Sequence, residues 1–219
     1  SINLITDFIL LQSSSATTVM VVSFVNAGLL TLTQSIGVIM GANIGTTVTA
    51  WLISLLGFKV DISVFALPII GLAIPFIFSK NMQKNSIGQL IIGFAILFMG
   101  LAFLKGAVPD IKGNPEVLAF ISKYSSYGFG SILIFLSIGT LLTIVIQSSS
   151  AVMALTLVMC FNSWISFEMA AAMVLGENIG TTITANLAAL VVNQTAKRAA
   201  RAHFLFNVVG VSILLIVFH

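Results

Sequence analysis

Two stretches of this sequence contain no charged residue, and each is far longer than one membrane-spanning helix requires. They cover residues 8–58 and 124–167, whereas about 20 apolar residues are enough to cross the hydrocarbon core of a bilayer. Over the whole chain only 7% of residues are charged, and a soluble domain carries roughly 25%. A water-facing surface cannot be built from this composition, so the sequence predicts an all-α, multi-pass integral membrane protein in a lipid bilayer.

The charged residues and the single cysteine exclude several other functions. The net charge is only +3, and its position between the apolar runs relates to membrane topology and not to nucleic-acid binding. Cys160 lies in an apolar run, so it offers neither a disulfide nor a thiolate metal site. A serine hydrolase needs a base near its nucleophile, but the only histidines, His203 and His219, are far in sequence from the serine-rich motifs. We therefore predict that the chain is not an enzyme.

Two polar motifs occur twice in the chain at one constant spacing. The segment Gln-Ser-Ser-Ser-Ala stands at 12–16 and again at 147–151. The segment at 41–50 matches the segment at 176–185 in eight of ten positions, and both pairs are offset by 135 residues. Polar motifs that are repeated together inside apolar sequence indicate an internal duplication.

The duplication predicts two inverted-topology repeats. Repeat one covers residues 1–104, an inter-repeat loop with a short interfacial helix covers 105–123, and repeat two covers 124–219. In repeat one we expect a re-entrant helical hairpin at 2–28, a broken transmembrane helix at 34–58 and further spans at 62–79 and 86–104. In repeat two we expect a hairpin at 126–161, a broken span at 167–192 and a span at 201–218. Three spans separate the two hairpins, and an odd number places the hairpins on opposite faces of the membrane.

Length and residue type give the reasons for the hairpins and the broken helices. The ten apolar residues 16–25 after the first serine motif are too few to cross about 30 Å of hydrocarbon at roughly 1.5 Å per residue. Glycine, asparagine and threonine within 41–50 are weak helix formers that compete for backbone hydrogen bonds, so we expect the helix to unwind there. Only eleven residues precede Gln12, whereas 23 uncharged residues precede Gln147, and part of repeat one is expected to be missing from this sequence.

The repeated motifs supply only neutral polar groups. Serine hydroxyls can donate to an anion or coordinate a cation, and the amides of Gln12 and Gln147 can do both. Helix ends at the hairpin tips add N–H groups that suit an anion and carbonyl groups that suit a small cation. No Lys or Arg lies near the motifs, and an unpaired anion is costly to bury. The motifs therefore suit an oxyanion that is carried together with Na⁺.

The segment Gln-Ser-Ser-Ser followed by Gly-(Ala/Glu)-Asn-Ile-Gly-Thr-Thr, present in two copies, resembles the type II sodium-dependent phosphate cotransporter family, including its bacterial members. The resemblance implies a secondary active transporter. This would be a sodium-coupled symporter of inorganic phosphate that works by alternating access in the plasma membrane, which in bacteria is the inner membrane. Two alternatives stay open: a sodium-coupled carrier of another oxyanion or a dicarboxylate, and a non-transporting membrane regulatory subunit.

The resemblance also implies which residues form the site. The predicted phosphate ligands are Ser13, Ser14, Ser15, Ser148, Ser149, Ser150, Asn43, Asn178, Thr46 and Thr181. The predicted Na⁺ ligands are Gln12, Gln147, Ser14, Ser149, Thr47, Thr182 and Glu177. Apart from Na⁺ as the coupling ion we expect no cofactor and no transition metal. A second copy of the chain and a PhoU-like regulator are further candidate partners.

Glu177 breaks the symmetry of the repeats, because its counterpart is Ala42. A carboxylate beside a site within the membrane is a functional hypothesis by default. Glu177 is predicted to bind a cation or carry a proton, and the alternatives are that it faces a polar vestibule or caps a half-helix. Glu168 is interpreted as a first-turn acid near the interface. His203 is expected to lie near the interface as well, after a basic loop at 197–198.

Overall fold

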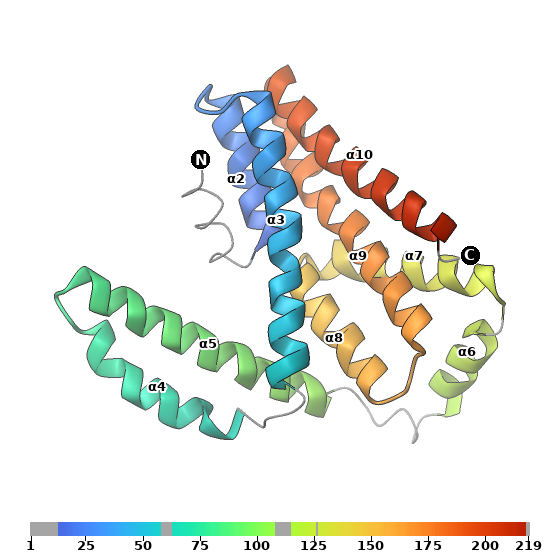
Figure 1. The fold of residues 1–219 in the computed structure, drawn as a ribbon, viewed down its shortest axis with the longest axis horizontal. Helices are drawn as coiled ribbons and strands as arrows, with labels where there is room; N and C mark the ends of the chain where they lie inside the picture. The colour runs from blue at the N-terminus through green and yellow to red at the C-terminus, as the bar shows by residue number, and fades with distance from the viewer. Residues whose placement is uncertain (1–12, 58–62, 108–114, 126, 218–219) are drawn as a thin grey trace. The chain divides into compact units, whose positions relative to one another are not determined.

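The computed structural model describes residues 13–57, 63–107, 115–125 and 127–217. All regular elements in these ranges are helical (Figure 1). They are α2 (Ser14–Asn26), α3 (Leu32–Leu52), the π-helical turn η1 (Ile53–Gly57), α4 (Ser63–Ile77), α5 (Met82–Ala107), α6 (Pro115–Ser125), α7 (Phe129–Ile146), α8 (Ser149–Phe161), α9 (Phe167–Ala188), the 3₁₀ turn η3 (Ala189–Val191) and α10 (Gln194–Val217). Within the described ranges, four segments are long and apolar enough to cross a membrane, namely Leu32–Leu55, Met82–Phe103, Phe129–Ile146 and Gln194–Val217. The prediction of an all-α membrane protein is confirmed.

The chain divides into two compact units. The first unit combines the chain up to Ala50 with the chain from Glu116 onward, and the second unit runs from Trp51 to Pro115. In the second unit α4 packs along α5, and the side-chain amide of Asn85 donates a hydrogen bond to the carbonyl of Ile77. The repeated polar motifs of both halves fall in the first unit, so the site is described within that unit.

The duplication extends to the helix boundaries. Helix α8 repeats α2 with the same 13-residue length, and α9 starts as far after α8 as α3 starts after α2. Two positions beyond the end of each short helix stands a residue of positive φ, Gly28 at 73° and Ser163 at 58°. The first is a glycine, for which this conformation costs little, whereas serine adopts it at a cost. The inverted orientation of the repeats and their domain boundaries remain predictions.

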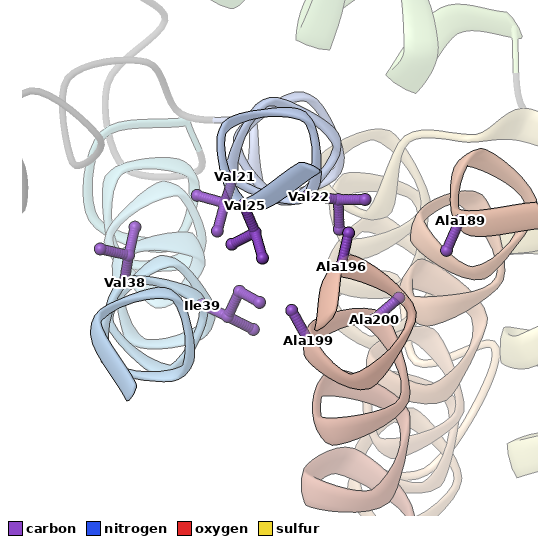
Figure 2. Close-up of a cluster of buried hydrophobic side chains, with 9 residues drawn as sticks. All are labelled: Val21, Val22, Val25, Val38, Ile39, Ala189, Ala196, Ala199 and Ala200. Carbon is purple, nitrogen blue, oxygen red and sulfur yellow. The ribbon is translucent and has the colours of Figure 1, made fainter. Parts of the chain in front are cut away.

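A small-residue core holds α2, α3 and α10 together in the first unit. Figure 2 shows valines of α2 facing Ile39 of α3 and alanines of α10. Ala196, Ala199 and Ala200 have no exposed surface. Small side chains let helix backbones approach closely, which is how helices associate in a membrane. The backbone N–H of Asn193 donates to Asn26 Oδ1 at 2.8 Å. The side-chain oxygen of Asn193 accepts from the backbone N–H of Ala196 and so caps the start of α10.

Glycines bring α7 and α9 into backbone contact. A Cβ atom added at Gly176 would overlap the carbonyl of Leu136, and one added at Gly139 would overlap the backbone of Met173. A Cβ atom at Gly180 would lie 2.7 Å from the carbonyl oxygen of Thr140. The Thr140 hydroxyl also lies 3.0 Å from the carbonyl oxygen of Gly176. The glycines of the second motif therefore serve helix packing in addition to any role at the site.

The predicted break within 41–50 and 176–185 is wrong, because α3 and α9 are continuous through both segments. Two features explain the continuity. The threonine hydroxyls bond to carbonyls of their own helix, and the glycines of α9 are stabilised by packing on α7. Irregular turns occur later in each predicted span, at η1 and η3.

Other boundaries also differ from the predictions. Helix α10 starts at Gln194, so Lys197 and Arg198 lie in a helix and the predicted basic loop is wrong. The short helix expected after residue 114 is confirmed as α6. Helix α7 is itself long enough to span, so treating the second hairpin as re-entrant remains a prediction. The first arm of the first hairpin, 2–11, lies outside the described residues.

Candidate functional site

Both serine motifs fold into the same helix cap. Ser13 and Ser148 precede α2 and α8 with similar backbone torsions, φ −130° and ψ 95° against φ −140° and ψ 98°. Each hydroxyl accepts a hydrogen bond at 3.3 Å, from the backbone N–H of Ala16 or Ala151. Serine is a favoured N-cap because its oxygen satisfies an N–H group that has no partner within the helix. The motif thus encodes its own local structure in both copies.

The two caps meet in one small cavity. The hydroxyl oxygens of the equivalent residues Ser14 and Ser149 lie 3.5 Å apart, and both side chains are buried. A cavity of about 100 Å³ is lined by Ser13, Ser14, Ser15, Gln147, Ser148, Ser149 and Ser150. We call it the serine cavity. It brings together all of the sequence-predicted serines, while Gln12 lies outside the described residues.

The serine cavity is electrostatically suited to an anion. The N-termini of α2 and α8 both adjoin it, and a helix N-terminus carries a partial positive charge and free N–H groups. No acidic residue stands in the first turn of either helix. The lining side chains are neutral hydroxyls and one amide, which can donate to an oxyanion or offer oxygen to a small cation.

A second cavity holds another part of the predicted site. It has a volume of about 230 Å³, and we call it the asparagine cavity. Its polar lining residues are Asn43, Thr47, Asn178 and Asn207, and its apolar ones are Ile44, Leu175, Phe206, Gly210, Val211 and Leu214. Those predicted ligands that line a cavity therefore divide between two cavities of the first unit.

The remaining predicted threonines line neither cavity. Thr46 donates to the carbonyl of Ala42 at 3.1 Å, and Thr181 donates to the carbonyl of Glu177 at 2.8 Å. Thr182 bonds in the same way to Ile179. Because each of these hydroxyls already donates its hydrogen within its own helix, only its oxygen lone pairs are free for a ligand. Their assignment as ligands stays a prediction.

Glu177 is fully buried in α9. Its Oε1 accepts a hydrogen bond from Thr156 Oγ1 of α8 at 2.8 Å, while its Oε2 is buried without a partner. The alternative in which this side chain faces a polar vestibule is wrong, because none of its surface is exposed. Burying an oxygen without a hydrogen-bond partner costs free energy. The Oε2 atom of Glu177 is therefore a polar atom whose hydrogen bonding is not satisfied.

The structure places His203 in a buried position and adds a residue that the sequence interpretation missed. His203 is 1% exposed and lies within α10 and not directly after a loop, while its position relative to the membrane interface stays a prediction. Its Nε2 lies 3.3 Å from Asn43 Oδ1, and Asn43 Nδ2 donates to Asn207 Oδ1 at 3.0 Å. Asn207 was not predicted. The signal available was its spacing, since polar residues four apart in an apolar helix share one face.

The fold and the site together define a helical membrane protein in which two copies of an uncharged serine motif, each at a helix N-terminus, line one polar cavity. The sequence model of the Na⁺/Pi-cotransporter family matches residues 5–106 and 119–218. The chain belongs to this family.

Several curated proteins are similar to this chain. A Bacillus subtilis protein named as uncharacterized, YqeW, is 36% identical over 94% of the chain. The Escherichia coli protein YjbB, whose name gives inorganic phosphate export as a candidate activity, is 30% identical over 94% of the chain. The sheep sodium-dependent phosphate transport protein 2A is 50% identical over 48 residues, which is 22% of the chain and 8% of that protein. The chain spans 64% of YqeW and 36% of YjbB. No solved structure matches the chain.

Proposed function

We propose that the chain forms the transport site of a sodium-coupled symporter of inorganic phosphate, which works by alternating access in the plasma membrane. The observation that carries this proposal is the contact between Ser14 and Ser149 across the serine cavity. Two capped helix N-termini that share one cavity provide hydroxyl and N–H donors from both repeats. Membership of the family and the names of the similar proteins support phosphate as the anion.

The absence of a cationic side chain among the residues that line the serine cavity supports coupling to Na⁺. An anion moved out of water needs compensation for its lost hydration. Neutral donors provide part of it, and a sodium ion held by nearby hydroxyl and carbonyl oxygens would provide the rest. Because neither ion is then well accommodated alone, the two ions bind together, and this is the physical basis of symport in the proposal.

Phosphate uptake into proteoliposomes is expected to depend on Na⁺. With choline in place of Na⁺, the initial rate should fall by roughly tenfold or more, within the range that coupled ligands produce. Radiolabelled phosphate measures the rate, and protein-free liposomes give the background. Uptake that is equal in choline and Na⁺ would contradict symport. Competition by excess sulfate or a dicarboxylate tests the other anions, and inhibition equal to that by unlabelled phosphate would show a less selective carrier.

Phosphate export is the second candidate function, favoured by the name of YjbB. The direction can be measured with the same proteoliposomes, loaded with labelled phosphate and diluted into phosphate-free buffer. Efflux that is driven by a Na⁺ gradient directed outward would fit a symporter running in reverse. Efflux that is independent of Na⁺ on either side would favour an exporter without sodium coupling.

Glu177→Gln is expected to raise the Na⁺ concentration needed for half-maximal uptake by about tenfold, which corresponds to roughly 1.4 kcal/mol. The amide keeps the size of the side chain and can still accept the hydrogen bond from Thr156, but it removes the negative charge that a cation would contact. The measurement is uptake as a function of Na⁺ concentration together with charge movement.

Glu168→Gln is the matched control, because Glu168 lies in the first turn of the same helix and is not a predicted ligand. Its Na⁺ dependence should equal that of the wild type. An unchanged Na⁺ dependence and unchanged charge movement in Glu177→Gln would exclude the ligand role of Glu177.

A further inference from the structure

The side chains of Asn43, His203 and Asn207 form a closed set of hydrogen bonds between α3 and α10. His203 Nε2 lies 3.3 Å from Asn43 Oδ1. Asn43 Nδ2 donates to Asn207 Oδ1 at 3.0 Å, and Asn207 Nδ2 donates to the backbone carbonyl of His203 at 3.0 Å. Two of these residues, Asn43 and Asn207, also line the asparagine cavity. The set therefore joins repeat one to repeat two at the wall of a cavity.

One backbone group fixes the direction of every bond in the set. A carbonyl oxygen can only accept, so the group of Asn207 that faces the His203 carbonyl must be its NH₂. The oxygen of Asn207 then faces Asn43, which must present its own NH₂ in return. The oxygen of Asn43 is thereby turned toward His203, so Nε2 must carry the hydrogen. His203 Nδ1 is buried without a partner, which leaves the neutral Nε2–H tautomer as the one that fits.

This direction decides what Asn43 can offer to a ligand. Its oxygen accepts from His203 and one of its N–H groups is used by Asn207, so its remaining donor is the second N–H, beside one lone pair of the oxygen. Asn207 is in the same position, because its oxygen accepts from Asn43 while one N–H is used by the His203 carbonyl. Both residues thus retain an N–H donor, which is the group that an oxyanion requires.

The second repeat lacks an equivalent set. Asn178 corresponds to Asn43 and also lines the asparagine cavity, but its amide makes no side-chain hydrogen bond among the described residues. At the positions equivalent to His203 and Asn207, repeat one has Pro68 and Leu72, which have no polar side-chain atom. One asparagine of the duplicated pair is fixed and the other is free to turn.

We infer that His203 and Asn207 are positioning residues that hold the Asn43 amide with its N–H toward the asparagine cavity, and that they thereby make this cavity selective for an oxyanion such as phosphate. The inference rests on the proposed transport function and adds to it a specificity determinant outside the serine cavity.

Two histidine variants test the inference by geometry. The amide nitrogen of glutamine can occupy the place of histidine Nε2, whereas that of asparagine reaches only the place of Nδ1. His203→Gln keeps a donor for Asn43 Oδ1, and its KM for phosphate is expected within about twofold of wild type. His203→Asn removes the hydrogen bond to Asn43 Oδ1 and leaves the Asn43 amide held by Asn207 alone. Its KM should rise about tenfold, as expected when one positioned hydrogen bond is lost, with a smaller change in Vmax. Ser212→Ala on α10 is the control, because that exposed hydroxyl bonds only to its own helix.

The KM and Vmax values of these variants distinguish a failure of this inference from a failure of the proposed function. Equal KM values for His203→Gln and His203→Asn, or a change confined to Vmax, would overturn the inference while phosphate transport by the wild type stands. A wild type that does not transport phosphate under any ion gradient would remove the proposed function itself. In the double variant His203→Asn with Asn207→Leu, KM should rise by less than the product of the two single effects, because residues in one network are not additive. A rise equal to the full product would contradict a shared network.

A spectroscopic measurement covers the case in which His203→Asn does not fold. The chain has two histidines, so ¹⁵N-histidine labelling of a His219→Gln variant leaves His203 as the single source of signal. The nitrogen shifts should show the neutral Nε2–H tautomer. A signal from the Nδ1–H tautomer, or from a doubly protonated ring, would reverse the direction of the hydrogen bonds and overturn the inference.

Discussion

Replacing Ser149 by alanine is expected to lower phosphate uptake at low phosphate concentration by roughly 10- to 100-fold, because a hydrogen bond to a charged ligand is worth about 1.5–3 kcal/mol. Ser149 is buried, and its hydroxyl faces Ser14 across the serine cavity. The change removes a donor from the place where both repeats meet, but it leaves the cap of α8 intact because Ser148 provides that cap. Initial rates in proteoliposomes over a range of phosphate concentrations measure the effect.

Ser23→Ala is the matched control for this prediction. Ser23 lies in α2, is exposed, and bonds only to the carbonyl of Val19 in its own helix. Its uptake should equal that of the wild type. If Ser149→Ala transports phosphate with the wild-type KM and rate, the serine cavity is not the binding site and the proposed function loses the observation that supports it.

Gly176→Ala is expected to destabilise the first unit by about 3 kcal/mol, the upper end of the usual cost of overpacking. The added methyl group would overlap the carbonyl of Leu136, and backbone atoms cannot move aside as a flexible side chain can. Helices α7 and α9 must therefore separate, which also breaks the contact of Thr140 with the Gly176 carbonyl. Unfolding by heat or denaturant in detergent measures the loss.

Gly37→Ala tests whether the effect depends on packing and not on the loss of a glycine as such. Gly37 lies in α3 with nothing within 4 Å of an added Cβ atom. Alanine is a better helix former by about 1 kcal/mol, so Gly37→Ala should be neutral or stabilising. Equal stability of Gly176→Ala and Gly37→Ala would show that the close approach of α7 and α9 does not contribute to the stability of the fold.

The helical membrane class and the serine caps could be predicted because their causes lie within short segments. Apolar length determines that a helix can span, and a serine ahead of a helix determines a cap whatever the surroundings. The similar backbone torsions at Ser13 and Ser148 show that the short segment itself determines the cap. The meeting of the two caps could also be anticipated, but only because the chain repeats its motifs.

The continuity of α3 and α9 could not be predicted in the same way. Gly176, Gly180 and Thr181 are residue types with low helix propensity. Propensity contributes little to the free energy of a helix compared with tertiary packing, which overrides it here. The two glycines pack on α7, and the threonine bonds to its own helix. A single sequence does not show which helices pack against each other. The contact of His203 with Asn43, across 160 residues, was missed for the same reason.

Ser14 touches its own counterpart, Ser149, so equivalent residues of the two copies of the motif meet in the serine cavity. In the proposed function, an ion bound in this cavity would be offered matching oxygens by each copy of the motif. One substitution would then remove a ligand supplied by one copy of the motif, and the corresponding pair of substitutions would remove the equivalent ligands of both copies.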